Sequence, residues 1–111
     1  MRLLFVDDHP VVSAGLAARY AALDGCVVVG TATTFHDALA RADEVDIAVV
    51  DVQLEVMLTP RQVALLAERT RVVLFSARSG DPVVQQLLAS GATAVLDKAA
   101  AHAEAKKIDP A

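Results

Sequence analysis

The chain has 111 residues, of which 55% are hydrophobic, and its formal net charge is −4 at pH 7. This length supports one domain with a real core, and no apolar run approaches the roughly 20 residues of a membrane-spanning helix. The N-terminus lacks the pattern of a signal peptide, and the scattered basic residues argue against nucleic-acid binding by this segment. A single cysteine, Cys26, cannot form an internal disulfide, so we expect a reducing, cytoplasmic setting and a small core residue there.

The first elements alternate between an apolar run and a helical pattern. Residues 2–7 hold an apolar run that ends in acids and predict a strand. Pro10 suits the first turn of a helix, where no backbone N–H is needed, and apolar residues at helical spacing continue to about Leu23. Residues 26–29 form a second β-branched run, which we expect Gly30 to close.

The next helix and strand repeat this alternation. Thr34 and Asp37 resemble a capping box at a helix start, and the helix should end near Ala42. Residues 46–51 then predict a strand buried on both faces, because Ile and Val dominate the run. The strand ends in Asp51, and a carboxylate in this position costs free energy unless a cation or hydrogen-bond donors meet it.

A loop over residues 52–58 leads to a third helix and a fourth strand. Thr59 and Gln62 form the pattern of a capping box, with proline at the first helical position between them. Residues 71–75 are again apolar and β-branched and predict a strand that ends in Ser76.

The C-terminal third completes the alternation. Asp81, followed by proline, should cap the fourth helix, which should stop at Gly91. Residues 93–96 predict a fifth strand ahead of Lys98, and the alanine-rich residues 99–107 predict a last helix. Five strands that alternate with five helices predict an α/β fold with a parallel sheet.

Polar side chains stand at the ends of four of the predicted strands. In a parallel sheet these ends share one edge, where open α/β sheets bind ligands. Carboxylates there suit a hard cation such as Mg²⁺, a lysine or serine can contact a phosphoryl oxygen, and an aspartate can be the nucleophile. The set therefore predicts phosphoryl transfer to an aspartate. Its members are Asp7, Asp8, Asp51, Ser76 and Lys98.

His9 and the apolar residues 56–58 lie near these strand ends in the sequence, and we assign neither to the metal site. His9 follows the acids, but Mg²⁺ prefers oxygen ligands, so we assign His9 to the helix start and not to the metal site. Val56, Met57 and Leu58 are apolar residues expected to be exposed in the loop, and they serve either loop packing or a partner surface.

These residues resemble the receiver domain of bacterial response regulators, over nearly the whole chain. The resemblance implies one receiver domain over residues 1–111, with a doubly wound, flavodoxin-like sheet of five parallel strands in the order 2-1-3-4-5 and helices on both faces. The matching segments are Phe5–Pro10, Val49–Leu54, Leu74–Ala77 and the stretch from Gly91 to Lys98.

The resemblance also implies roles for the strand-end residues. Asp51 would be the phosphoacceptor, and Ser76 and Lys98 would contact the phosphoryl group. Mg²⁺ would be the cofactor, held by Asp8, Asp51 and the backbone carbonyl of Gln53, with help from Asp7.

The partners follow from the same resemblance. A sensor histidine kinase would supply the phosphoryl group, and the domain would be a signalling module that takes part in its own phosphorylation and dephosphorylation. The Asp7–Pro10 start is similar to regulators with a LuxR-type output domain, which implies either a receiver cut from a longer protein with a DNA-binding output domain or a single-domain regulator. The resemblance leaves open whether the domain forms a homodimer. We expect neither direct nucleic-acid binding by this domain nor membrane association.

Departures from the family pattern, at Val95 and in the loop after Asp51, where Glu55 and Thr59 replace a common proline and glycine, leave a second interpretation open. Val95 stands three positions before Lys98, where members commonly carry an aromatic switch residue. The chain could therefore be a degraded receiver that acts as a phosphorylation-independent interaction domain. A third candidate, a haloacid-dehalogenase-type hydrolase, needs a second acid at the position that Gln53 occupies, which disfavours it.

Overall fold

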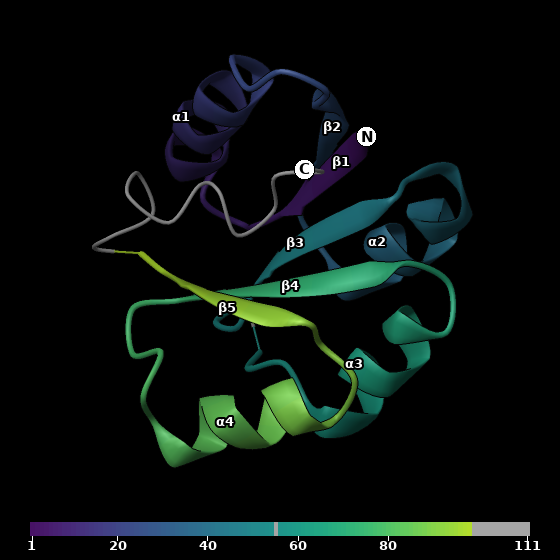
Figure 1. The fold of residues 1–111 in the computed structure, drawn as a ribbon. Helices are drawn as coiled ribbons and strands as arrows, with labels where there is room; N and C mark the ends of the chain where they lie inside the picture. The colour runs from purple at the N-terminus through teal and green to yellow at the C-terminus, as the bar shows by residue number, and fades with distance from the viewer. Residues whose placement is uncertain (55, 99–111) are drawn as a thin grey trace.

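Five strands lie parallel in one sheet, in the order β2-β1-β3-β4-β5 (Figure 1). The computed structural model describes residues 1–54 and 56–98. The predicted fold class and strand order are therefore confirmed. The strands are β1 (Arg2–Val6), β2 (Val27–Ala32), β3 (Ile47–Asp51), β4 (Arg71–Ser76) and β5 (Ala94–Asp97).

Helices connect successive strands throughout the described residues. None of these helices is long and apolar enough to cross a membrane. The helix predicted over residues 99–107 lies outside the described part of the chain. The α-helices are α1 (Pro10–Ala21), α2 (Phe35–Arg41), α3 (Pro60–Ala67) and α4 (Pro82–Ala89), and a 3₁₀ turn (Ala42–Glu44) follows α2.

Side-chain caps begin three of these helices, as the sequence predicts. The Thr59 hydroxyl accepts the Gln62 N–H at 3.2 Å, and the Gln62 side chain accepts the Thr59 N–H at 3.0 Å, which completes a capping box. Thr34 accepts the Asp37 N–H at 3.1 Å, and the Asp81 carboxylate caps α4. The caps therefore define the residues at which the loops after β2, β3 and β4 end and the helices begin.

The sheet separates two hydrophobic cores. On one face α1 packs on β1 and β2, the Phe5 and Tyr20 rings stack with centroids 5.5 Å apart, and buried residues of β3, β4 and β5 belong to the same core, together with Cys26. On the other face α2, α3 and α4 cover the same strands, with fully buried residues such as Val63 and Leu87 (Figure 1). Burial on both faces explains why β3 is apolar at every position before its last residue.

The prediction that Gly30 closes the second strand is wrong. Strand β2 continues through Gly30 to Ala32, and its pairing with β1 shifts register beside Leu4. The Arg41 guanidinium packs over Gly30 so closely that a Cβ there would meet it, and it donates to the Thr31 carbonyl at 2.8 Å. The glycine therefore marks a close approach of a side chain within a strand. Other described boundaries differ from the predicted ones by one or two residues.

The loop after β3 also differs from expectation in one residue. Leu58 is only 3% exposed and its N–H donates to the Val52 carbonyl at 2.9 Å, so the prediction that it is exposed is wrong. Val56 and Met57 are exposed at 78% and 38%, as predicted. The loop folds back on itself, and this turns Leu58 into the core.

Gly91 is a position where we expect a methyl group to be harmful. Its φ is +136°, a conformation that L residues rarely adopt, and a Cβ would lie 3.0 Å from the Ala67 Cβ. We expect Gly91→Ala to lower the free energy of unfolding by about 1–3 kcal/mol in urea denaturation. Gly15→Ala is the matched control, because open space surrounds Gly15 in α1, and it should raise stability by about 0.5–1 kcal/mol. Equal effects of the two substitutions would contradict this account.

Candidate functional site

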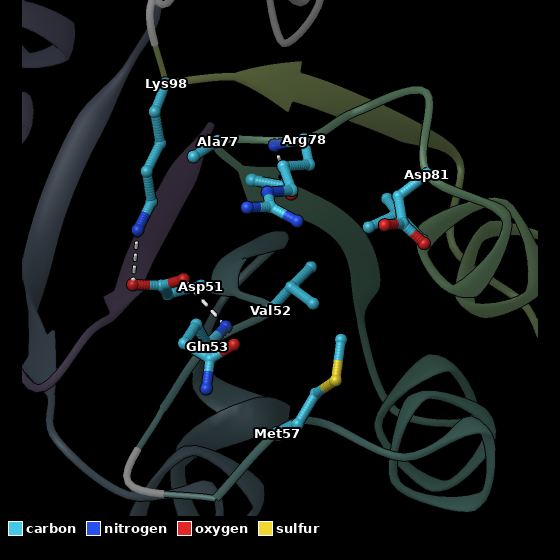
Figure 2. Close-up of a pocket in the computed structure, with 10 residues that line it drawn as sticks. Asp51, Val52, Gln53, Met57, Ala77, Arg78, Asp81 and Lys98 are labelled. Atoms are coloured by element: carbon cyan, nitrogen blue, oxygen red, sulfur yellow. Dashed lines mark hydrogen bonds and ion pairs between the residues drawn. The ribbon is translucent and has the colours of Figure 1, made fainter.

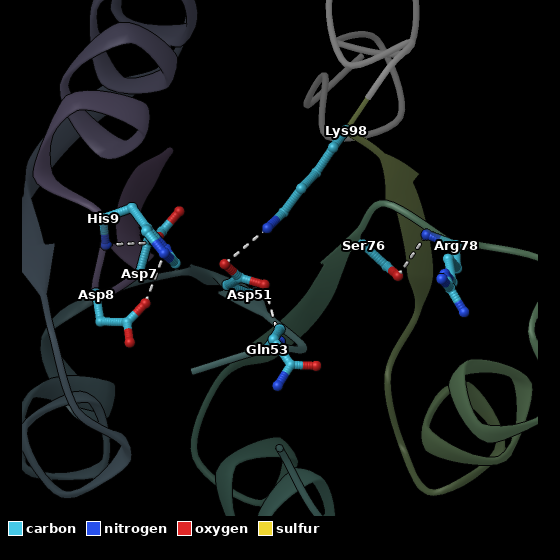
Figure 3. Close-up of polar contacts among 8 residues, drawn as sticks. All are labelled: Asp7, Asp8, His9, Asp51, Gln53, Ser76, Arg78 and Lys98. Atoms are coloured by element: carbon cyan, nitrogen blue, oxygen red, sulfur yellow. Dashed lines mark hydrogen bonds and ion pairs between the residues drawn. The ribbon is translucent and has the colours of Figure 1, made fainter. Parts of the chain in front are cut away.

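The parallel sheet brings the predicted polar residues together at one edge (Figure 3). Asp7 and Asp8 follow β1, Asp51 and Ser76 are the last residues of β3 and β4, and Lys98 follows β5. The Lys98 side chain reaches across the edge toward Asp51 (Figure 3). The carboxyl ends of all strands meet here because every strand runs in the same direction.

Asp51 lies at the centre of this edge and is only 1% exposed. The Lys98 Nζ donates to its Oδ2 at 2.8 Å, and the Gln53 backbone N–H donates to its Oδ1 at 2.9 Å. Burial raises the pKa of the Asp51 carboxyl above its usual 3.8, against the opposing effects of the Lys98 and Gln53 hydrogen bonds and the Lys98 charge, while the Asp7 charge raises it further. The two donors thus compensate only partly for the burial of a reactive carboxylate.

The raised pKa predicts how Asp51 affects stability. Because the pKa of Asp51 is higher in the folded state than its usual 3.8, protonation of Asp51 favours the folded state. This contribution to stability is complete below pH 3.8 and is lost as the pH rises through the folded-state pKa. Asp51→Asn carries no charge to bury, so it should be more stable than the parent chain at pH 7, with a gap that shrinks toward pH 4. Urea denaturation at several pH values, with a chelator present, measures this gap. A gap that grows toward acid pH would contradict it.

Asp7, Asp8 and His9 form a compact group beside Asp51. The His9 backbone N–H donates to Asp7 Oδ1 at 2.8 Å, and the His9 Nδ1 lies 3.1 Å from the same oxygen. Asp7 is 3% exposed, and its Oδ2 accepts no hydrogen bond within the described residues. Such a buried, unsatisfied carboxylate oxygen needs a cation or a donor.

The donor set fits a divalent metal ion. One ligand atom from each of Asp7, Asp8, His9 and Asp51 lies within 4.8 Å of the others. Opposite ligands of a cation with ~2.1 Å bonds lie about 4.2 Å apart, so one ion can reach these atoms with small adjustments. Oxygen predominates in the set, as hard cations require.

A pocket of about 390 Å³ opens beside Asp51 (Figure 2). Lys98 and Arg78 supply cationic groups to its wall, and Met57 and Val84 supply apolar surface. Sequence reasoning missed Arg78. Its place two residues after Ser76, on the loop that leaves β4, is the signal that could have identified it. Asp51 and Asp81 line the pocket as well, so Lys98 and Arg78 balance two carboxylates there and can contact an anionic group beside Asp51.

The remaining predicted residues lie in the same region. Ser76 is buried at the pocket wall, and its Oγ accepts the Arg78 N–H at 3.0 Å, which leaves its own hydrogen able to donate. Gln53 contacts Asp51 through its backbone. Val95 is 9% exposed and packs in the core beneath the edge, on the face that α4 covers.

Comparison with known proteins agrees with this geometry. The sequence model of the response regulator receiver domain matches residues 3–108. The chain is 31% identical over 109 residues to the response regulator GacA of Pseudomonas viridiflava and 27% identical to UvrY of Escherichia coli K12, covering 94% of this chain in both cases. The chain spans about half the length of these relatives, 51% and 50%.

Solved structures share the fold. The signal receiver domain of the response regulator NarL from Mycobacterium tuberculosis superposes with a TM-score of 0.82 at 30% identity, covering 96% of this chain and 90% of that one. The response regulator domain of Thermotoga maritima CheB also gives 0.82, at 22% identity, with 97% and 90% covered, and shows the fold alone.

Proposed function

The chain belongs to the response regulator receiver domain family, and from this premise we propose that Asp51 accepts a phosphoryl group from a sensor histidine kinase. The observation that carries the proposal is the position of Asp51, a buried carboxylate paired with Lys98 at 2.8 Å and adjoining both an acidic cluster and a pocket lined by Lys98 and Arg78. A carboxylate used only for structure would not need this pocket.

Mg²⁺ is the proposed cofactor, and the acids at the edge would hold it. Asp7, Asp8, Asp51 and the backbone carbonyl of Gln53 are the proposed ligands, and the unsatisfied Oδ2 of Asp7 supports this set. When bound, Mg²⁺ neutralises carboxylates that would otherwise repel an incoming phosphate dianion.

The chain's own residues would carry the transfer. An Asp51 oxygen attacks the phosphorus of phosphohistidine, the P–N bond breaks, and the imidazole nitrogen leaves with the bonding pair. Lys98 exchanges its contact with Asp51 Oδ2 for the transferred phosphoryl oxygens, and the Ser76 hydroxyl donates to them. Later hydrolysis of the acyl phosphate would return Asp51 to its free state.

We further propose the setting of this module. The chain forms the receiver part of a longer cytoplasmic regulator, because its relatives are about twice as long. Its output would be transcription through a DNA-binding domain, on the similarity of Asp7–Pro10 to regulators of the LuxR type. Val95 has no ring to move, so the signal would run through the loop after Ser76 and the start of α4.

Acetyl phosphate tests the proposal without the kinase. Incubation with Mg²⁺ should add one phosphoryl group, read by intact mass, and a chelator should prevent the gain. Mg²⁺ binding without any gain of mass would favour the phosphorylation-independent interaction domain.

A further inference from the structure

We propose that His9 is a nitrogen ligand of the metal site, which makes the site selective for divalent first-row transition ions over Mg²⁺. The inference rests on the proposed metal site at the sheet edge and adds a ligand that the oxygen-only set lacks. It reverses our assignment of His9 to the helix start alone.

The positions of three atoms carry the argument (Figure 3). The His9 Nδ1 lies 3.1 Å from Asp7 Oδ1 and 2.9 Å from Asp8 Oδ1. Adjacent ligands on an octahedral ion with bonds of ~2.1 Å lie about 3 Å apart. The imidazole nitrogen and the two carboxylate oxygens thus already have the spacing of ligands that share one ion.

Hydrogen bonding accounts for only part of this arrangement. Asp8 Oδ1 is buried, yet it accepts no well-aligned hydrogen bond within the described residues although the His9 Nδ1 is 2.9 Å away. Asp7 Oδ2 is likewise buried and unsatisfied, on a residue that is 3% exposed. Unsatisfied oxygens on both acids that the imidazole contacts indicate that an ion completes the group.

The local backbone fixes the ligands in this arrangement. The His9 N–H donates to Asp7 Oδ1 at 2.8 Å, which orients the Asp7 carboxylate, and Pro10 begins α1 immediately afterwards. The His9 side chain remains 61% exposed, so an ion can reach it from solvent.

The chemistry of the ligand set selects the class of ion. Imidazole nitrogen suits Zn²⁺, Ni²⁺ and Fe²⁺, carboxylate suits Mg²⁺ and Mn²⁺, and affinity rises from Mn²⁺ toward Zn²⁺ at mixed sites. Three carboxylates with one imidazole therefore favour a transition ion, while the three oxygens alone still accept Mg²⁺.

Mn²⁺ is a suitable probe because pulsed electron spin resonance detects nitrogen bonded to it. The Mn²⁺-loaded chain should show the ¹⁴N coupling of imidazole, and His9→Gln should lose it. His36→Gln is the matched control, because His36 lies exposed on α2, and it should keep the coupling. By calorimetry, His9→Gln should weaken Mn²⁺ binding at least about tenfold and Mg²⁺ binding much less.

The unaltered chain provides a measurement that does not depend on variant folding. The ¹⁵Nδ1 resonance of His9 should show the large shift of a metal-bound nitrogen on addition of Zn²⁺ and a much smaller one with Mg²⁺, which binds only the neighbouring carboxylates. Bound Mn²⁺ without nitrogen coupling, coupling that survives His9→Gln, equal losses for both ions, or no transition-ion binding would each overturn the inference. Mg²⁺-dependent phosphorylation would persist in those cases if the proposed function is right, so the two failures are distinguishable.

Discussion

Asp51→Asn is expected to abolish the gain of a phosphoryl group from acetyl phosphate in Mg²⁺. An amide has no anionic oxygen to attack phosphorus, whereas its shape matches the carboxyl group closely. The burial of the Asp51 charge makes Asn at least as stable at neutral pH, so an inactive variant would not be an unfolded one.

Asp81→Asn is the matched control for this loss. Asp81 also lines the pocket, and its carboxylate accepts the Val83 N–H at 2.9 Å as the cap of α4. Asparagine caps helices equally well, so this variant should fold and be phosphorylated like the parent chain. A mass gain retained by Asp51→Asn and lost by Asp81→Asn would move the acceptor to Asp81. A gain retained by both would point to the acids after β1.

The sequence predicted the positions of the site residues better than their contacts. Apolar runs that end in Asp7, Asp51 and Ser76 required only the rule that parallel strands finish at one edge. The pairing of Lys98 with Asp51 spans 47 positions in the chain, and no local pattern encodes it. The resemblance to the receiver family implied that these residues act together, and the sheet brings them together.

The residues that sequence reasoning missed depend on loop geometry. Arg78 enters the pocket because the chain turns just after β4, and Leu58 is buried because the loop after β3 folds back onto Val52. His9 was set aside on chemical preference, yet its ring lies within 3.1 Å of both neighbouring acids. Gly30 was read as a strand end, although β2 continues through it to Ala32 with the Arg41 guanidinium packed over it.

Lys98→Gln should slow phosphoryl transfer from acetyl phosphate by about 10²–10³-fold, the usual loss when one aligned donor to a developing charge is removed. The Lys98 ammonium is 2.8 Å from Asp51 Oδ2 and lies over the Phe75 ring, 5.4 Å from its centroid, so its position is fixed before phosphate arrives. Glutamine can still donate but carries no charge, and the transferred group is anionic. Intact mass measured at timed intervals would give the rate.

The Mg²⁺ affinity of Lys98→Gln shows whether the substitution acts through the phosphoryl group or through the metal site. Lys98 competes with a cation for Asp51 and repels it, so Lys98→Gln should bind Mg²⁺ as tightly as the parent chain or more tightly. Arg71→Gln is the matched control, since Arg71 begins β4 at the opposite end of the sheet and donates to Thr93 at 3.1 Å. Its rate should not change. A slower Lys98→Gln reaction that recovers at saturating Mg²⁺ would assign Lys98 to metal binding and contradict its contact with phosphate.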